Sequence, residues 1–147
     1  MAILPANNII SPGWIPIERF DERSDLVNVA AGAGVAGVAP QIVLTKEIPP
    51  AARALLLEMN LRLPDGAGYD QIYFQLTRNG HSISPWDFIS ATQVELIPTI
   101  DIGAEFEGGL LELLAWNISG TSWPGASLNA AAIRVTASIR GQLLKKT

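Results

Sequence analysis

Apolar and polar residues alternate along much of the chain after residue 46. From residue 55 to residue 63 every odd position holds leucine or methionine, while glutamate, asparagine and arginine occupy three of the even positions. Side chains of a β-strand point to opposite faces in turn, so this period of two predicts a strand over residues 51–63. The composition of residues 51–60 also suits a helix, but the alternation continues for nine positions and favours the strand.

A β-hairpin is predicted next along the chain. Apolar and polar residues alternate over residues 71–77, and Asn79-Gly80 follows. Both central residues of a type I′ turn need positive φ, and Asn-Gly is the dipeptide that tolerates this best. A two-residue loop would pair Arg78 with His81. His81, the only histidine of the chain, is therefore expected to be an exposed residue at the tip of the hairpin.

Three further segments have strand patterns. Residues 94–102 alternate, and Pro98 indicates an edge strand or a bulge. Residues 108–117 are apolar on both faces except for Glu112, as expected for a central strand covered on both sides. Residues 131–144 place alternate apolar side chains on one face. Together with the other segments, they predict an all-β fold, an antiparallel β-sandwich or jelly roll of about eight strands with an extended N-terminal arm.

A run of twenty residues, 26–45, contains no charged residue. A membrane span and a fusion peptide are alternatives for such a run. Pro40 and several polar residues interrupt it, however, and its middle consists mostly of alanine and glycine, which contribute little to insertion. We expect instead a short strand at 26–30, a crossing of small residues that permits close backbone approach, and a second strand at 41–45.

The first 40 residues lack a clear period. Over residues 1–25, isolated apolar residues lie among prolines and a glycine, which is typical of an extended arm that docks on a neighbour. The opening residues have neither the basic region nor the unbroken apolar core of a signal peptide. The predicted organisation is an extended N-terminal arm with a small-residue segment over 1–40, followed by a β-sandwich (jelly-roll) domain over 41–147.

Composition narrows the classes of partner. The 147 residues include 48% hydrophobic but only 16% charged residues, no cysteine, and a net charge of −4. Nucleic-acid binding requires clustered lysine and arginine, which this sequence does not show, so we expect no nucleic-acid partner and no membrane partner. So few charges favour a surface that is covered by copies of the same chain or by other proteins.

No pattern of catalytic or ligand-binding residues stands out. His81 has no nucleophile motif to serve, and the run Gly32–Gly37 lacks the lysine of a phosphate-binding loop. Asp101, Glu105 and Glu107 lie close in sequence and could bind calcium, but they follow no known calcium-loop spacing, and no two acids stand out as a glycosidase pair. We therefore expect a protein that is not an enzyme, with no cofactor and no metal.

Tryptophans and apolar residues of the arm are the candidate contact residues. Trp86, Trp116 and Trp123 fall at strand ends or in loops, where they could plug the core, lie at a subunit interface, or stack on sugar rings; we favour the first two. The candidate interface residues are Ile3, Leu4, Ile9, Ile10, Trp14, Ile15, Trp86, Trp116 and Trp123. Asn117-Ile-Ser also matches the short motif for N-glycosylation.

Four stretches in order, "IPPAARALLLEMNLRL", "IYFQLTRNGHSI", "VELIPTIDIGAEFEGGLLELLAWNISGT" and "AAIRVTASIRGQLL", cover roughly residues 41–144. Their order resembles that of the jelly-roll decoration (cement) proteins of tailed bacteriophage capsids. The resemblance implies a non-enzymatic virion protein that binds the major capsid protein and copies of itself, as a homotrimer on the capsid surface, with a terminal arm gripping its neighbours. The main alternative is a glycan-binding β-sandwich module of a phage tail or fibre. A major capsid protein with a single jelly roll and a hydrolase are more distant alternatives.

Overall fold

The computed structural model describes residues 13–83, 88–91, 99–101 and 105–147, and within them the chain forms nine β-strands. Every pairing between them is antiparallel. The strands are β1 (Trp14–Arg23), β2 (Val27–Val29), β3 (Gln41–Arg62), β4 (Ile72–Arg78), β5 (His81–Ser82), β6 (Ile89–Ser90), β7 (Thr99–Asp101), β8 (Glu105–Asn117) and β9 (Ile133–Lys146).

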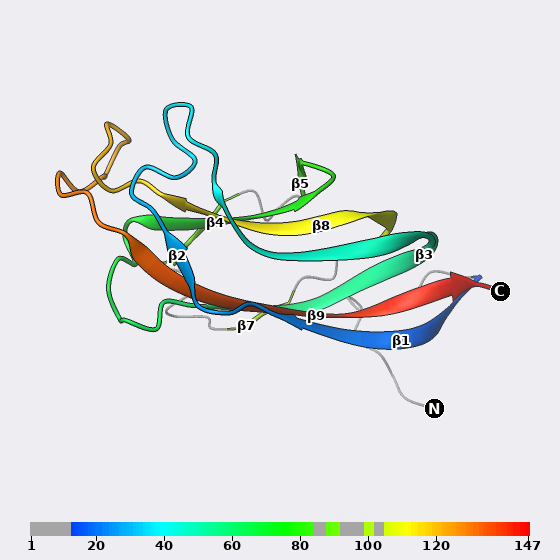
Figure 1. Cartoon of the computed structure of the whole chain (residues 1–147). Coiled ribbons are helices and arrows are strands. Elements are labelled where there is room, and N and C mark those ends of the chain that lie inside the picture. The colour runs from blue at the N-terminus through cyan, green and yellow to red at the C-terminus, as the bar shows by residue number, and fades with distance from the viewer. Residues whose placement is uncertain (1–12, 84–87, 92–98, 102–104) are drawn as a thin grey trace.

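The strands lie in two layers (Figure 1), which we call the upper and lower sheets after their places in that view. The upper sheet runs from the first half of β3 through β8 to β4, whose other edge carries β5 and β6. The lower sheet runs from β7 through the second half of β3 to β9, whose other edge carries β1 and β2. This arrangement confirms the predicted all-β antiparallel sandwich.

Strand β3 belongs to both sheets because it bends at Pro49 and Pro50. Residues before the bend pair with β8, and residues after it pair mainly with β9. On the facing strand, Gly108 and Gly109 have φ values of +62° and +109°, and a Cβ on Gly108 would lie 3.2 Å from the Cα of Pro50. Strands of packed sheets change layer at such bends and bulges. The strands expected at 41–45 and 51–63 are therefore two parts of one strand.

A bulge in β3 interrupts the alternation of residues 55–63. The pairing with β9 shifts between Leu56 and Glu58, which leaves Leu57 as the extra residue. Leu56 is buried in the core, Leu57 is only half-buried, and Met59 is buried again. The alternation that predicts the strand is therefore interrupted at Leu57, because one inserted residue moves the preceding side chains to the other parity.

The core lies between the sheets and is almost entirely apolar. The predicted inward residues of β9, from Ile133 to Ile139, are buried, which confirms the alternation there. Further along β9, Gly141 faces the ring of Phe20 on β1. A Cβ at Gly141 would lie 2.3 Å from Phe20 Cζ and 2.7 Å from the carbonyl oxygen of Leu55. The aromatic ring thus fills the space that a side chain would occupy.

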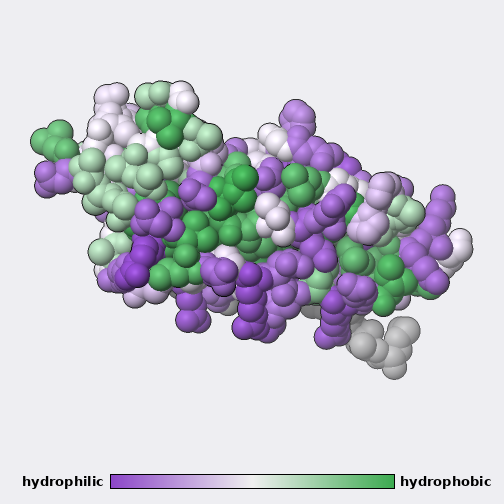
Figure 2. Space-filling view, in the orientation of Figure 1, coloured by the Kyte–Doolittle hydropathy of each residue, from purple (hydrophilic) through white to green (hydrophobic). Residues whose placement is uncertain are grey.

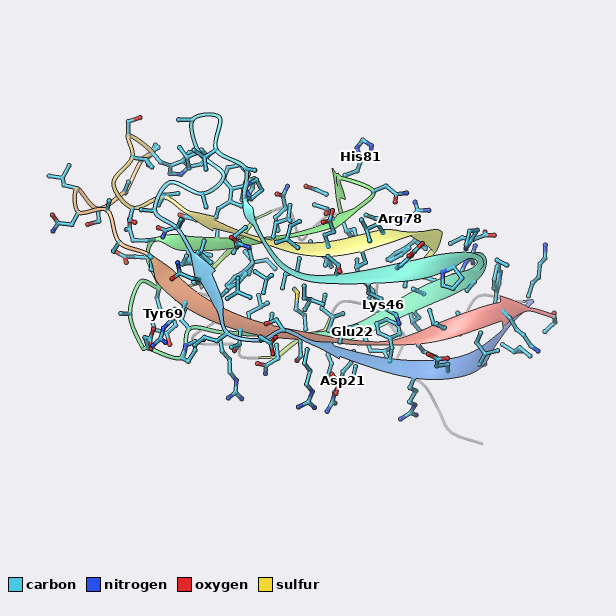
Figure 3. All side chains as sticks on the ribbon, viewed as in Figure 1. Asp21, Glu22, Lys46, Tyr69, Arg78 and His81 are labelled. Carbon is cyan, nitrogen blue, oxygen red and sulfur yellow. The ribbon has the colours of Figure 1, made fainter. Side chains whose placement is uncertain are left out.

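The predicted hairpin is confirmed. Asn79 and Gly80 have φ values of 51° and 80°, and Arg78 pairs with His81. His81 is exposed and points away from the sandwich at the hairpin tip (Figure 3). The Nε of Arg78 donates to the carbonyl of Gly108 at 2.8 Å, so the tip of the hairpin also holds the bend of β8 in place.

The N-terminal region requires a correction. Strand β1 pairs with β9 from Trp14 opposite Lys146 to Arg23 opposite Ser138, so these residues are part of the lower sheet and not of an arm. The alternation was not visible because β1 is an edge strand on which, among its ten residues, only Phe20 is fully buried. The short strand expected at 26–30 is confirmed as β2. Residues 1–12, where the arm remains a prediction, lie outside the described residues.

Candidate functional site

The two outer faces of the sandwich differ in character. The outer face of the lower sheet carries charged and polar side chains, and hydrophilic residues line the lower margin of the molecule (Figure 2). On the upper sheet, β8 presents Leu110, Leu114 and Trp116 outward together with Glu112, and Ile42 of β3 lies opposite Leu114 in the register. Ile42 is 47% exposed and Leu110 is also exposed. The expectation that both faces of β8 are covered holds only for the inner one.

Four aromatic side chains form a continuous row over the upper sheet, which we call the aromatic row. Tyr73 and Phe88 meet edge to face with ring centroids 6.5 Å apart, Phe88 and Trp116 at 4.9 Å, and Trp116 and Trp123 at 6.1 Å. Tyr73 and Trp116 lie directly opposite one another on β4 and β8. Such edge-to-face contacts stabilise by about 0.5–1.5 kcal/mol each beyond area burial.

Trp116 is fixed in the middle of the row. Its indole N–H donates to Gln75 Oε1 at 3.2 Å, and Gln75 Nε2 donates to Ser82 Oγ at 2.6 Å. Gly34, which has a φ of +85°, lies against the ring, because a Cβ there would come within 2.5 Å of the indole carbons. This contact explains one glycine of the small-residue segment. Trp116 positions the row, and Phe88 and Trp123 are its exposed members.

The predicted contact residues therefore divide into separate places. Trp116 and Trp123 are brought together, whereas Trp14 and Ile15 lie on β1 at the other end of the sandwich (Figure 1). Trp14 is half-buried beneath the guanidinium of Arg53, whose Cζ lies 4.4 Å from the ring centroid, and Ile15 is exposed. The other candidates, Ile3, Leu4, Ile9, Ile10 and Trp86, lie outside the described residues. Sequence reasoning missed Tyr73 and Phe88, because nothing local links either of them to a tryptophan more than 25 positions away.

Asn117 holds the end of β8 to its neighbours. Its side chain is fully buried, donates from Nδ2 to the carbonyls of Val29 at 3.0 Å and Ala131 at 2.7 Å, and accepts from the Ser119 N–H at 3.0 Å. An amide that is buried and bonded in this way cannot carry a glycan in the folded chain. Asn117 therefore has a structural role, although its sequence matches an N-glycosylation motif.

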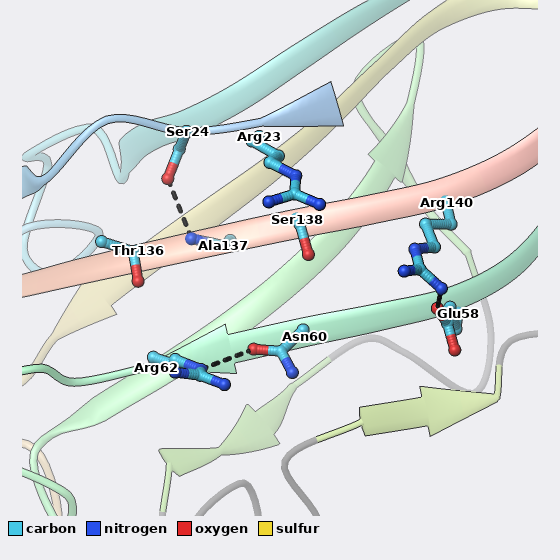
Figure 4. Close-up of a pocket in the computed structure, with 9 residues that line it drawn as sticks. All are labelled: Arg23, Ser24, Glu58, Asn60, Arg62, Thr136, Ala137, Ser138 and Arg140. Carbon is cyan, nitrogen blue, oxygen red and sulfur yellow. Dashed lines mark hydrogen bonds and ion pairs between the residues drawn. The ribbon is translucent and has the colours of Figure 1, made fainter. Parts of the chain in front are cut away.

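A polar groove of about 560 Å³ crosses the outer face of the lower sheet between β1, β9 and β3 (Figure 4). Its lining residues are Arg23, Ser24, Glu58, Asn60, Arg62, Thr136, Ala137, Ser138 and Arg140. Most of its charges are already paired: Arg140 bonds Glu58, and Arg23 Nη2 lies 2.9 Å from Asp21 Oδ2. The hydrogen bond from Arg23 lowers the pKa of Asp21 below its usual value. The groove is an ion-paired, solvated surface.

Side chains across the open side of the sandwich connect the two sheets. Lys46 of the upper sheet lies 3.3 Å from Glu22 of β1 and also lies over the ring of Phe20, with Nζ 5.4 Å from its centroid (Figure 3). An ion pair at a partly exposed site contributes about 1 kcal/mol or less.

The carboxylate of Asp65 provides a test of pH dependence. A hydrogen bond from Arg134, with Nε 2.7 Å from Asp65 Oδ2, lowers the pKa of Asp65 below its usual 3.8. A carboxyl whose pKa is lower in the folded state adds stability above its unfolded pKa and loses it as the pH falls through the folded value. Between about pH 5 and pH 3, we expect the urea midpoint to fall more for the wild type than for Arg134→Gln. An equal fall of the urea midpoint with pH in the two proteins would contradict this.

Within the part of the chain that the structure describes, no cluster of three histidine, cysteine or acidic side chains is arranged to hold a metal ion. Glu105 and Glu107, two of the acids considered for calcium, both lie near Arg53, at 3.2 and 3.9 Å. The side chain of Asp101, the third, is outside the description. The described residues include no helix with the length and apolar character needed to span a membrane.

Comparison of the chain with models of protein families finds no matching family, and comparison with curated proteins finds no similar sequence. The aromatic row with the apolar outer face of the upper sheet is thus the surface on which a function can be argued from geometry alone.

Proposed function

We propose that this chain is a non-enzymatic structural protein of a virus particle, a capsid decoration (cement) protein that binds the outer shell as an oligomer and stabilises it. Its partners are the major capsid protein and copies of itself, in a homotrimer on the capsid surface of a bacteriophage. The sequence resemblance suggests this class. The observation that carries the proposal is the difference between the two outer faces: the upper one exposes Ile42, Leu110 and the aromatic row with few charges among them, whereas the lower one is lined by ion pairs.

A body of this kind suits attachment. The upper sheet exposes Ile42 and Leu110 together with the aromatic row. Burial of such apolar surface by another chain lowers the free energy and so favours binding. The opposite face, with its paired charges, remains compatible with water. Many copies on one shell multiply a modest contact through effective concentration.

Attachment can be measured with shells that lack this chain, prepared from the virus that encodes it. We expect purified protein to co-sediment with these shells and to raise their temperature of disruption. Substituting Ile42→Asp together with Leu110→Asp is expected to reduce occupancy at least tenfold, because two charges would be buried in the contact. The charge-matched control, Thr136→Asp together with Ser138→Asp in the polar groove, should bind normally. Equal binding by all three proteins would refute the proposal.

A glycan-binding module of a phage tail or fibre is the second candidate, because the fold brings Trp123 and Phe88 side by side with Trp116. Exposed aromatic rings of this kind can stack on the apolar faces of sugars. This function predicts specific binding on a glycan array that Trp123→Ala abolishes, with no binding to shells. Deleting residues 1–12 leaves β1 intact. A loss of binding in this variant would assign the binding to an N-terminal arm and not to the aromatic row or the outer face of the upper sheet.

A further inference from the structure

Two long segments without any charged residue, 26–45 and 113–133, are far apart in the sequence. The fold brings their loops, residues 30–40 and 118–132, to the same end of the upper sheet (Figure 1). The N–H of Gly32 donates to the carbonyl of Asn117 at 2.9 Å, and the Asn117 N–H donates to the carbonyl of Ala33 at 3.0 Å. We call residues 30–40 and 118–132 the neutral loops.

The neutral loops expose large apolar side chains. Leu128 is 96% exposed, Val38 is 52% exposed and Trp123 is 40% exposed. Scattered exposed apolar residues are ordinary, but these three lie in loops that offer no charge to keep them solvated. The nearest charges along the chain are Asp25 and Lys46 for the first segment and Glu112 and Arg134 for the second, and all four lie outside the loops. An uncharged centre with charges at its border is the composition of a protein interface.

The neutral loops are also held in place. Ser119 and Ala131 form two hydrogen bonds: Ser119 Oγ donates to the Ala131 carbonyl at 3.0 Å and accepts from the Ala131 N–H at 3.1 Å. Gln71 donates to the Gly125 carbonyl and accepts from the Ser127 N–H at 2.7 Å. Loops ordered before binding lose little conformational entropy when a partner covers them.

The charge distribution of the chain favours a second copy of itself as the partner of the neutral loops. The chain carries a net charge of −4, so two copies repel each other on average, and the repulsion is weakest where neither copy has a charge. Acidic lipid head groups attract basic residues, and neither segment has one. A second copy of this chain presents the same uncharged apolar surface. We propose that copies of the chain associate with one another through the neutral loops; this deepens the proposed function by locating the contact of its oligomer.

The test measures molar mass by size exclusion with light scattering, over a range of protein concentrations. Wild type is expected to be an oligomer, and Val38→Asp with Leu128→Asp is expected to raise its dissociation constant by about 30-fold or more, as loss of central contact residues does. Ile17→Asp is the control for a charge added at an exposed apolar position, because Ile17 is 49% exposed and lies on β1, away from the loops. Circular dichroism and urea unfolding confirm that each variant is folded.

The outcomes separate this inference from the proposed function. A wild type that is monomeric at all concentrations, or an oligomer that Ile17→Asp dissociates and the loop variant does not, overturns the inference even if the protein still binds shells. A loop variant that keeps the oligomer but loses attachment to shells or to neutral lipid vesicles assigns the loops to another partner and also overturns it. An oligomer that depends on the loops but never binds shells supports the inference and refutes the decoration function.

Discussion

Replacing Asn117 with alanine is expected to lower the free energy of unfolding by about 3 kcal/mol, because the side chain is buried and makes three hydrogen bonds. The substitution removes the side-chain hydrogen bonds to the carbonyl of Val29 and from the N–H of Ser119, whereas the carbonyl of Ala131 keeps the bond from Ser119 Oγ. Buried polar groups without a partner cost about 1–3 kcal/mol each, although water can enter the vacated space and reduce the sum. Urea denaturation followed by tryptophan fluorescence measures the change.

Two controls make the result specific. Asn129→Ala removes the same side chain at an exposed position and should change the free energy of unfolding by less than about 0.5 kcal/mol. Asn117→Asp keeps the size but directs a carboxylate oxygen at two carbonyl oxygens, so at neutral pH it should destabilise at least as much as alanine. If Asn117→Ala were as stable as the wild type, Asn117 would not hold β8, β2 and the second neutral loop together.

Gly141→Ala is expected to lower the free energy of unfolding by about 2–3 kcal/mol, as overpacking of a well-packed core does. The new Cβ would lie 2.3 Å from Phe20 Cζ and 2.7 Å from the backbone oxygen of Leu55. The ring can move outward, but the backbone of β3 cannot do so without disturbing its pairing with β9. The measurement is again equilibrium unfolding in urea.

A double-mutant cycle identifies the cause. In a Phe20→Ala background the two ring contacts with the new Cβ are absent, so Gly141→Ala should cost less than it does in the wild type, with the contact to Leu55 remaining. The coupling should be about 1 kcal/mol or more. Additive costs would mean that the ring of Phe20 does not fill the space above Gly141.

Local sequence patterns were sufficient to predict the elements whose structure depends on residues adjacent in the sequence. The Asn79-Gly80 turn and the alternation of β9 could be predicted because positive φ and one buried face leave direct marks in the sequence. The bend at Pro49-Pro50 was visible only as a strand boundary, since the sequence does not show that hydrogen bonding resumes on another strand beyond it. The bulge at Leu57 left no mark, because leucine fits a buried and a half-buried position equally well.

The candidate surface could be predicted only in part. Trp116 and Trp123 were identified as aromatic residues at strand ends, but their union with Phe88 and Tyr73 depends on pairing between β4 and β8. The uncharged run at 26–45 was noticed, whereas its meeting with residues 113–133 follows from backbone bonds around Asn117. Edge strand β1 was interpreted as an arm because exposure on both faces removes the alternation on which the prediction relies.

Strand β9 lies between β1 and the second half of β3, yet it follows every other strand in the sequence. During synthesis the lower sheet therefore lacks its central strand until β9 has left the ribosome. Until then β1 has no neighbour to pair with, and two unpaired edges are available to other nascent chains. Completion of this layer acts as a timing step, so the sandwich is finished only after β9 has been translated.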